Sequence, residues 1–153
     1  MSDIFDNIEP MVHKSRIHVP YHWWAGETAS RFLVSLRDDQ KILGTKCAEC
    51  GKTFVPPRKT CPTCFTLNEE WKEISPRGTL VTYTVVRRHL ASLPKKPPII
   101  YGLIHLEGAD TSLLHIIGEV KPEEVKIGMK LQAKFAVERK GTIFDIEYFR
   151  PEK

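Results

Sequence analysis

Four cysteines are the residues of this sequence best suited to do chemistry. Cys47 and Cys50 are separated by two residues, ten residues follow, and Cys61 and Cys64 repeat the short spacing. Two such pairs supply four thiolates to one tetrahedral ion, so the spacing predicts a structural zinc site without an open coordination position. The first pair is followed by a glycine, whose permissive backbone lets amides point at sulfur. Phe65 holds the matching place after the second pair, so we expect a different geometry there.

Two other uses of the four cysteines compete with zinc. An iron site of the rubredoxin kind has almost the same spacing and is the stronger alternative. Disulfides are less expected, because we expect a cytoplasmic protein and such proteins seldom keep them. Either metal would help to fold about 30 residues that have too little apolar surface to fold alone. Either metal would also occupy every thiol, which leaves no cysteine nucleophile.

Other catalytic patterns are missing from the sequence. It contains no GxSxG nucleophile elbow, no GxGxxG fingerprint and no P-loop. The six histidines lack the spacing of a second metal site, and His105 and His115 fall within apolar strands, where we expect packed, hydrogen-bonded side chains. The sequence therefore offers no convincing catalyst of its own.

The cysteines lie between a helical and a β-rich part of the chain. Residues 1–20 contain two prolines that forbid one continuous helix, and we expect this arm to order only when it packs on something. Residues 21–43 show helical spacing of apolar side chains. The run Tyr21-His22-Trp23-Trp24 opens this helix; a local core is its ordinary interpretation and a partner-contacting anchor the sharper one.

From residue 76 the apolar period changes to that of strands. We expect strands at 78–88, 99–107, 112–119 and 130–138, and a last one that carries Phe144, Ile146 and Tyr148 on one face. Residues 107–110 supply a hairpin connection, and residues 122–125 form a short turn between the third and fourth strands. Five strands of this kind predict a closed barrel of the OB type.

The resulting fold class is mainly β with N-terminal helices, in which a rubredoxin-like zinc ribbon precedes a five-stranded OB-type barrel. The expected units are an arm and helical segment at 1–43, the ribbon at 44–75 and the barrel at 76–153.

The net charge is +4, and its basic surplus lies in the barrel half, which is compatible with a phosphate-bearing ligand. No apolar run approaches the ~20 residues that span a bilayer, so we expect no membrane partner.

Several runs of the sequence together resemble one family, the zinc-ribbon and OB-fold proteins associated with acyl-CoA enzymes, long known as a domain of unknown function. The resemblance covers about residues 21–150. The runs that carry it are Tyr21-His22-Trp23-Trp24, Cys47-Ala48-Glu49-Cys50-Gly51, Phe54-Val55-Pro56-Pro57-Arg58, Cys61-Pro62-Thr63-Cys64, and, after Trp71, residues 75–86 (SPRGTLVTYTVV) and 125–129 (VKIGM).

The resemblance implies a non-catalytic accessory subunit of a thiolase-superfamily enzyme that makes or breaks C–C bonds in CoA thioesters. Thiolases rank first as partners, followed by hydroxymethylglutaryl-CoA synthases and thiolase-like aldolases. The partner would supply the nucleophile and the acid and base groups. This chain would supply structure and, as in some members, part of the CoA channel. A heterotetramer is the default assembly by analogy.

A set of basic residues in the barrel half is the best candidate for CoA contact. Arg87, Arg88 and His89 end the first barrel strand, and Lys95 and Lys96 follow in a proline-stiffened loop. Arginine can fork onto phosphate oxygens and lysine can supply a mobile charge. An exposed loop without a ligand is the alternative.

Two other functions also stay open: a stand-alone acyl-CoA-binding protein, and a less expected single-stranded nucleic-acid-binding module.

Overall fold

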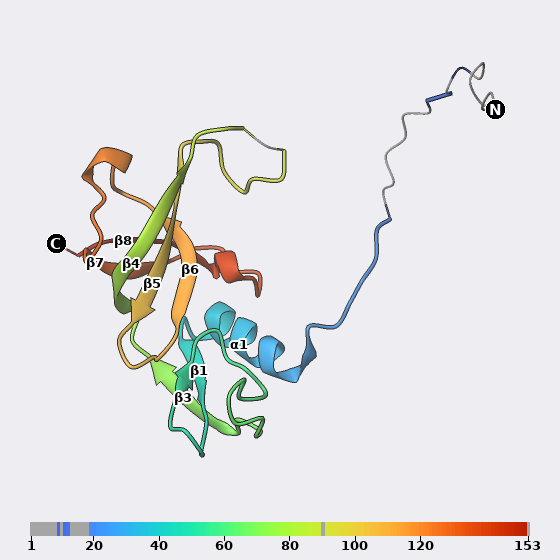
Figure 1. The fold of residues 1–153 in the computed structure, drawn as a ribbon, viewed down its shortest axis with the longest axis vertical. Helices are drawn as coiled ribbons and strands as arrows, with labels where there is room; N and C mark the ends of the chain where they lie inside the picture. The colour runs from blue at the N-terminus through green and yellow to red at the C-terminus, as the bar shows by residue number, and fades with distance from the viewer. Residues whose placement is uncertain (1–8, 10, 13–18, 90, 153) are drawn as a thin grey trace, which may run out of the picture.

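The computed structural model describes residues 9, 11–12, 19–89 and 91–152 (Figure 1). One α-helix leads into a small sheet, and a second group of strands closes into a barrel. The elements in chain order are α1 Gly26–Asp38, β1 Ile42–Lys46, β2 Thr53–Phe54, β3 Glu70–Ile74, β4 Arg77–Val86, β5 Ile99–Leu106, β6 Ser112–Ile117, the 3-10 turn η1 Pro122–Glu124, β7 Lys130–Phe135, the 3-10 turn η2 Ile143–Asp145 and β8 Ile146–Pro151.

The barrel has the strand order β4-β5-β6-β8-β7 and closes through antiparallel pairing of β4 with β7. The strands β6 and β8 pair in parallel, and the other neighbours are antiparallel. Close packing inside the barrel requires a glycine on β5, since a Cβ on Gly102 would lie 2.5 Å from Ile117 Cδ1 and 2.7 Å from Leu80 Cδ1. The predicted fold class, a cysteine-rich ribbon followed by a five-stranded OB-type barrel, is confirmed.

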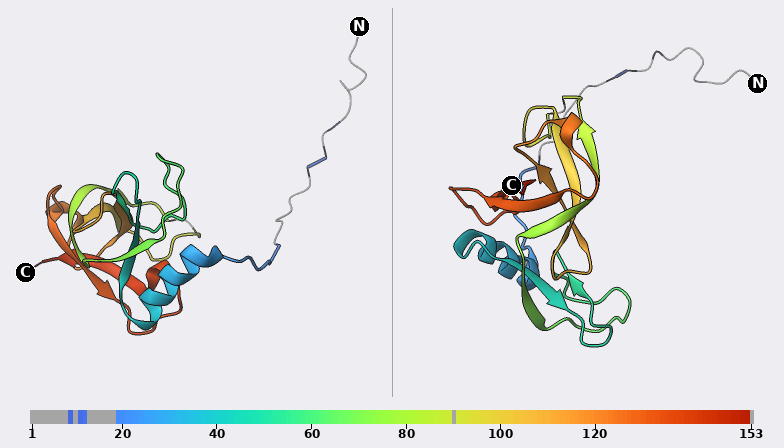
Figure 2. Two further views of the ribbon diagram at one scale, coloured as in Figure 1. Left: turned by 90° about the horizontal axis from the view of Figure 1, so that it is seen from below. Right: turned by 90° about the vertical axis from the view of Figure 1, so that its left-hand side faces the viewer.

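The ribbon is a three-stranded sheet with the order β2-β1-β3, and α1 packs against β1. The Arg31 guanidinium of α1 lies 4.4 Å from the centre of the Trp71 ring on β3. The buried side chains of Leu36 on α1, Ile42 on β1 and Ile74 on β3 belong to the same apolar cluster as the barrel core. The helix, the ribbon sheet and the barrel therefore share one continuous core. Figure 2 shows the helix beside both the ribbon sheet and the barrel.

A turn of the barrel also holds the ribbon through hydrogen bonds, and we call this contact the turn clasp. It joins Asp110 and Thr111, which follow β5, to Thr53 and Val55 at β2. The Asp110 amide donates to the Thr53 carbonyl at 2.8 Å, and the Thr53 amide donates to Asp110 Oδ2 at 2.8 Å. The Thr111 hydroxyl accepts from the Val55 amide at 2.8 Å and donates to the Val55 carbonyl at 3.0 Å.

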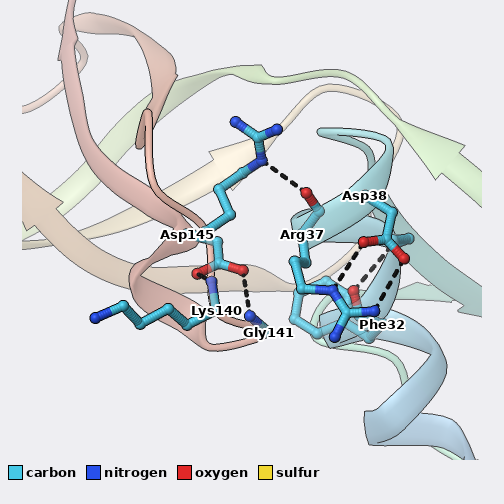
Figure 3. Close-up of polar contacts among 8 residues, drawn as sticks. Phe32, Arg37, Asp38, Lys140, Gly141 and Asp145 are labelled. Carbon is cyan, nitrogen blue, oxygen red and sulfur yellow. Dashed lines mark hydrogen bonds and ion pairs between the residues drawn. The ribbon is translucent and has the colours of Figure 1, made fainter.

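The loop between β7 and β8 is tied to itself and to the helix (Figure 3). The buried carboxylate of Asp145 accepts hydrogen bonds from the amides of Lys140 at 2.9 Å and Gly141 at 2.7 Å. From the same loop, Arg139 Nε donates to the Arg37 carbonyl of α1 at 2.7 Å. This carbonyl lies in the last turn of the helix, where helical partners for C=O groups run out.

The helix is shorter than the predicted span of 21–43. It begins at Gly26, and residues 19–25 have no regular structure. It ends at Asp38 because Gln40 takes a left-handed backbone with φ 55°, and Ile42 then pairs with Ile74 in the sheet. Among the helices of the described residues, none has the length and apolar character to cross a membrane.

The predicted alternation in the last strand is wrong. β8 begins at Ile146, Phe144 lies in the preceding 3-10 turn with 49% of its surface exposed, and Tyr148 is only half-buried. The fully buried aromatic side chain is that of Phe149. The cause is a register shift between β7 and β8: Lys134 pairs with Tyr148 and Phe135 with Ile146, so Glu147 is an extra residue and the alternation changes phase within β8.

Candidate metal centre and ligand groove

The ribbon brings all four cysteine sulfurs together. The Sγ atoms of Cys47, Cys50, Cys61 and Cys64 lie within 4.8 Å of one another. The Cys50 and Cys61 sulfurs are 3.8 Å apart. Four sulfurs at about 2.3 Å from one tetrahedral zinc are about 3.8 Å apart, so this spacing fits the ion. The sulfurs of Cys47 and Cys61 belong to buried residues, and Cys50 is exposed.

The two cysteine pairs are held by equivalent turns. The Gly51 amide donates to the Cys47 carbonyl at 2.9 Å, and the Phe65 amide donates to the Cys61 carbonyl at 3.0 Å. Gly51 has φ 72° and Phe65 has φ 59°, so both take the left-handed backbone. The expectation of a different geometry in the second turn is therefore wrong. This backbone conformation is unfavourable for a residue with a side chain. The Phe65 side chain is not held by packing, since 81% of its surface is exposed.

The pKa values of Cys47 and Cys64 differ widely. The Thr66 hydroxyl, 3.5 Å from the Cys47 sulfur, and then the Cys50 amide lower the pKa of Cys47 to about 6. Desolvation, together with hydrogen bonds to the neighbouring thiols, raises the pKa of Cys64 to about 12. Four thiols this close cannot all ionise without a cation, and a bound divalent ion would displace the protons that remain.

The basic residues predicted to contact CoA divide into two groups. Arg87, Arg88 and His89 follow the end of β4 and are exposed, and the Arg87 guanidinium lies 4.0 Å from a carboxylate oxygen of Glu123. Lys95 and Lys96 instead line an open groove, which sequence reasoning did not predict, with a cavity volume of about 370 Å³.

The groove lies between the β4–β5 loop and the end of β6. It combines cationic side chains with an apolar lining, and its principal residues are Lys95, Lys96, Lys121, Ile99, Ile100, Ile116, Ile117 and Tyr148. The Lys95 ammonium lies 5.2 Å from the centre of the Tyr148 ring. The groove also contains Glu119, which accepts a hydrogen bond from the Tyr148 hydroxyl at 2.7 Å; this bond lowers the pKa of the Glu119 carboxyl.

The two strand histidines have opposite environments. His115 is 4% exposed, its Nε2 lies 3.1 Å from the Ile143 carbonyl, and its ring stacks edge-on against Phe149 at 5.6 Å. Burial lowers its pKa. The prediction of a packed, hydrogen-bonded histidine is confirmed for His115. It is wrong for His105, which points to the exposed side of β5.

The aromatic run before the helix is exposed. Tyr21, Trp23 and Trp24 keep 74%, 74% and 77% of their surfaces accessible, so the interpretation as a local core is wrong. Figures 1 and 2 show the segment leading from α1 away from the ribbon and the barrel. We define residues 21–24 as the aromatic segment.

Comparisons with known proteins agree with this architecture. Residues 35–70 match the family model of the ChsH2 rubredoxin-like zinc ribbon domain, and residues 71–136 match that of the ChsH2 C-terminal OB-fold domain. A DUF35 domain-containing scaffold protein of Pyrococcus furiosus is 33% identical over 116 residues, which are 76% of this chain and 82% of the relative. One from Methanocaldococcus jannaschii is 34% identical over 95 residues, 61% of this chain and 67% of the relative.

Two solved structures have the same fold. A chain of the Ltp2-ChsH2(DUF35) aldolase is 21% identical with a TM-score of 0.61, covering 79% of this chain and 91% of that chain. A DUF35-family protein of unknown function from Sulfolobus solfataricus is 25% identical with a TM-score of 0.63, covering 83% of this chain and 87% of that one. The zinc-ribbon match and the four-cysteine cluster together support zinc binding.

Proposed function

Because the chain belongs to the DUF35 family, we propose that it is a non-catalytic accessory subunit of a thiolase-superfamily enzyme acting on CoA thioesters. The observation that carries this proposal is the ribbon-and-barrel architecture. This chain shares it with relatives described as scaffold proteins, over most of its own length and of theirs. A scaffold contributes binding surface and geometry, which agrees with a ribbon whose four sulfurs lie close enough together to bind one ion.

In this proposal the metal is structural. Cys47, Cys50, Cys61 and Cys64 would hold zinc as a complete tetrathiolate shell, which leaves no position for substrate. The ion would fix the two turns and, through the turn clasp, the edge of the barrel. Bound zinc supplies folding energy here and takes no part in the reaction.

The catalytic groups come from a larger thiolase-fold partner, with a thiolase ranked before a hydroxymethylglutaryl-CoA synthase or an aldolase. The solved relative in the Ltp2-ChsH2(DUF35) aldolase supports an assembly with a catalytic subunit. We expect a heterotetramer of two chains each, because thiolase-fold enzymes are generally dimeric and each protomer would carry one accessory chain.

The lysine-lined groove is the proposed contact for CoA. Its apolar lining suits the pantetheine arm, and Lys95, Lys96 and Lys121 would meet phosphate oxygens. Glu119 does not repel the ligand strongly, since Lys134 and Arg150 lie 3.5 and 3.6 Å from its carboxylate oxygens. Holding the arm in this way would orient the thioester at the partner's active site. Arg87, Arg88 and His89 stay candidates for the outer phosphates.

The accessory role is tested by purifying the chain from its own host together with its partner. We expect a thiolase-fold subunit, identified by mass spectrometry, to co-elute in equal amount, and its activity to fall when this chain is removed and to return when it is added back. A partner that is fully active and stable alone would refute the proposal.

The groove is tested by calorimetry with CoA on the isolated chain and on the complex. The triple variant Lys95→Ala, Lys96→Ala, Lys121→Ala should weaken CoA binding to the complex about tenfold or more, and the exposed ribbon variant Lys52→Ala should not. Tight binding to the isolated chain would favour a stand-alone acyl-CoA-binding protein. Equal binding by the triple variant and the control would exclude the groove.

A further inference from the structure

The aromatic segment carries more exposed apolar surface than the fold of this chain explains. Tyr21, Trp23 and Trp24 are each about three-quarters exposed, and the described residues before them that are apolar, Met11, Val12 and Val19, are 65–98% exposed. Soluble proteins rarely leave contiguous apolar surface uncovered unless it binds something. Tryptophan and tyrosine are also the residues that most often dominate the energy of protein interfaces.

Trp24, the last residue of the aromatic segment, borders a depression that reaches the ribbon. Trp24 lines a depression of about 310 Å³ together with Glu27 and Lys59. Glu27 and Lys59 also line a second depression of about 400 Å³, which extends to Leu67 and Trp71. The two depressions adjoin because they share Glu27, Thr28 and Lys59, and we call them together the hollow. Leu67 is itself 56% exposed.

The backbone conformation of Phe65, two residues before Leu67, is energetically unfavourable. Its left-handed backbone, with φ 59°, is a conformation that costs roughly 1–2 kcal/mol for a residue with a side chain. The equivalent position of the first turn is Gly51, which avoids this cost. The Phe65 ring is 81% exposed, so it gives little packing within the chain in return. A strained residue with an exposed aromatic ring is expected where that ring is used.

We propose that the aromatic segment, the hollow and Phe65 together form the surface on which the catalytic partner subunit docks. This inference rests on the proposed function and names the part of the chain that carries it. Full burial of the four aromatic rings would remove roughly 450–750 Å² of surface, against about 800 Å² per partner in a standard protein interface. The matching partner surface must offer apolar recesses sized for indole and phenyl rings.

The charged side chains of the hollow fit the polar rim that surrounds the apolar core of a protein interface. Lys59 Nζ and the Glu27 carboxylate lie 4.0 Å apart, and the Arg31 guanidinium covers the Trp71 ring at 4.4 Å. With Glu69, which also lines the hollow, two acidic and two basic residues leave its lining without net charge. Recognition is therefore expected to depend on aromatic packing and only weakly on salt.

The test compares three variants for binding to the purified thiolase-fold subunit, measured by biolayer interferometry with the full chain. Trp24→Ala should weaken binding by at least about 30-fold, as truncation of an interface hot spot does. Phe65→Gly removes both the ring and the backbone strain. It should raise the Tm of the isolated chain by about 1–3 °C and still weaken binding by about tenfold. Val137→Ala, a control at a 96% exposed valine of the barrel, should bind like the wild type.

The outcomes separate this inference from the proposed function. If the wild-type chain binds no thiolase-fold subunit, the accessory role itself fails and the inference fails with it. If the wild type binds and both aromatic variants bind within twofold of it, the partner docks elsewhere and only the inference is overturned. Self-association of the isolated chain in sedimentation velocity that Trp24→Ala abolishes would assign the surface to a second copy, which also overturns it.

Discussion

The turn clasp offers the sharpest test of how the ribbon is coupled to the barrel. Replacing Thr111 by valine keeps the shape of the side chain and removes its hydroxyl. Both hydrogen-bonding groups of Val55 then lose their partner, and Val55 is only 1% exposed. A buried backbone group left unpaired costs about 1–3 kcal/mol, so Thr111→Val should lower the free energy of unfolding by about 2–4 kcal/mol.

The consequence should reach the metal centre, because Val55 lies in the segment that connects the two cysteine turns. We expect a Tm lower by roughly 4–15 °C for a chain of this length. We also expect zinc to pass at least about tenfold faster to a chromogenic chelator, because local opening of the ribbon becomes easier. Differential scanning fluorimetry and stopped-flow absorbance measure the two effects.

The matched control is Thr82→Val, an equally isosteric change at an exposed position of β4, which should alter stability by no more than about 0.5 kcal/mol. If Thr111→Val behaves like this control in both assays, the clasp does not couple the two parts and the reasoning is refuted. If stability falls and the rate of zinc transfer does not change, the clasp supports the barrel alone.

Three further outcomes are expected. Asp145→Ala leaves the amides of Lys140 and Gly141 without their acceptor and should cost about 2–4 kcal/mol in urea unfolding; a loss below about 0.5 kcal/mol would contradict the loop assignment. Burial lowers the pKa of His115, so as the pH falls the unfolded chain takes up the proton before the folded chain does. The free energy of unfolding should therefore be highest above about pH 7 and decrease below pH 6.5. His115→Gln should flatten that fall relative to the wild type; an unchanged pH profile would show that His115 is not its cause. Chelation of zinc, or Cys61→Ser, should abolish the native amide signals of the ribbon in NMR spectra, and a ribbon that stays folded without metal would refute its structural role.

Local patterns in the sequence were sufficient for much of the fold. The cysteine spacing predicts the ribbon because two short turns are enough to converge four sulfurs, and the alternation of apolar residues predicts the barrel strands because each has one buried face. Where these patterns failed, distant contacts decided the outcome. His105 and His115 have similar neighbours along the chain, and only the facing of each side chain relative to the barrel separates the buried ring from the exposed one.

The groove shows the same limit for the candidate ligand site. Lys95 and Lys96 could be chosen from charge and loop composition, but Lys121 joins them only because the end of β6 returns beside the start of β5. Arg88 and His89 are adjacent in sequence to the loop and do not line the groove. The left-handed backbone of Phe65 was also missed, because residue type argues against it and only the equivalence of the two cysteine turns requires it.

The hydrogen bond from Arg139 fixes the position of the last turn of α1, and the helix acts as a spacer from that point. One end is fastened to the barrel loop, and the other carries the aromatic residues. Thirteen residues at 1.5 Å each give a rod of about 20 Å between them. A deletion of four residues from this rod would shorten the reach by about 6 Å and turn its end by about 40°.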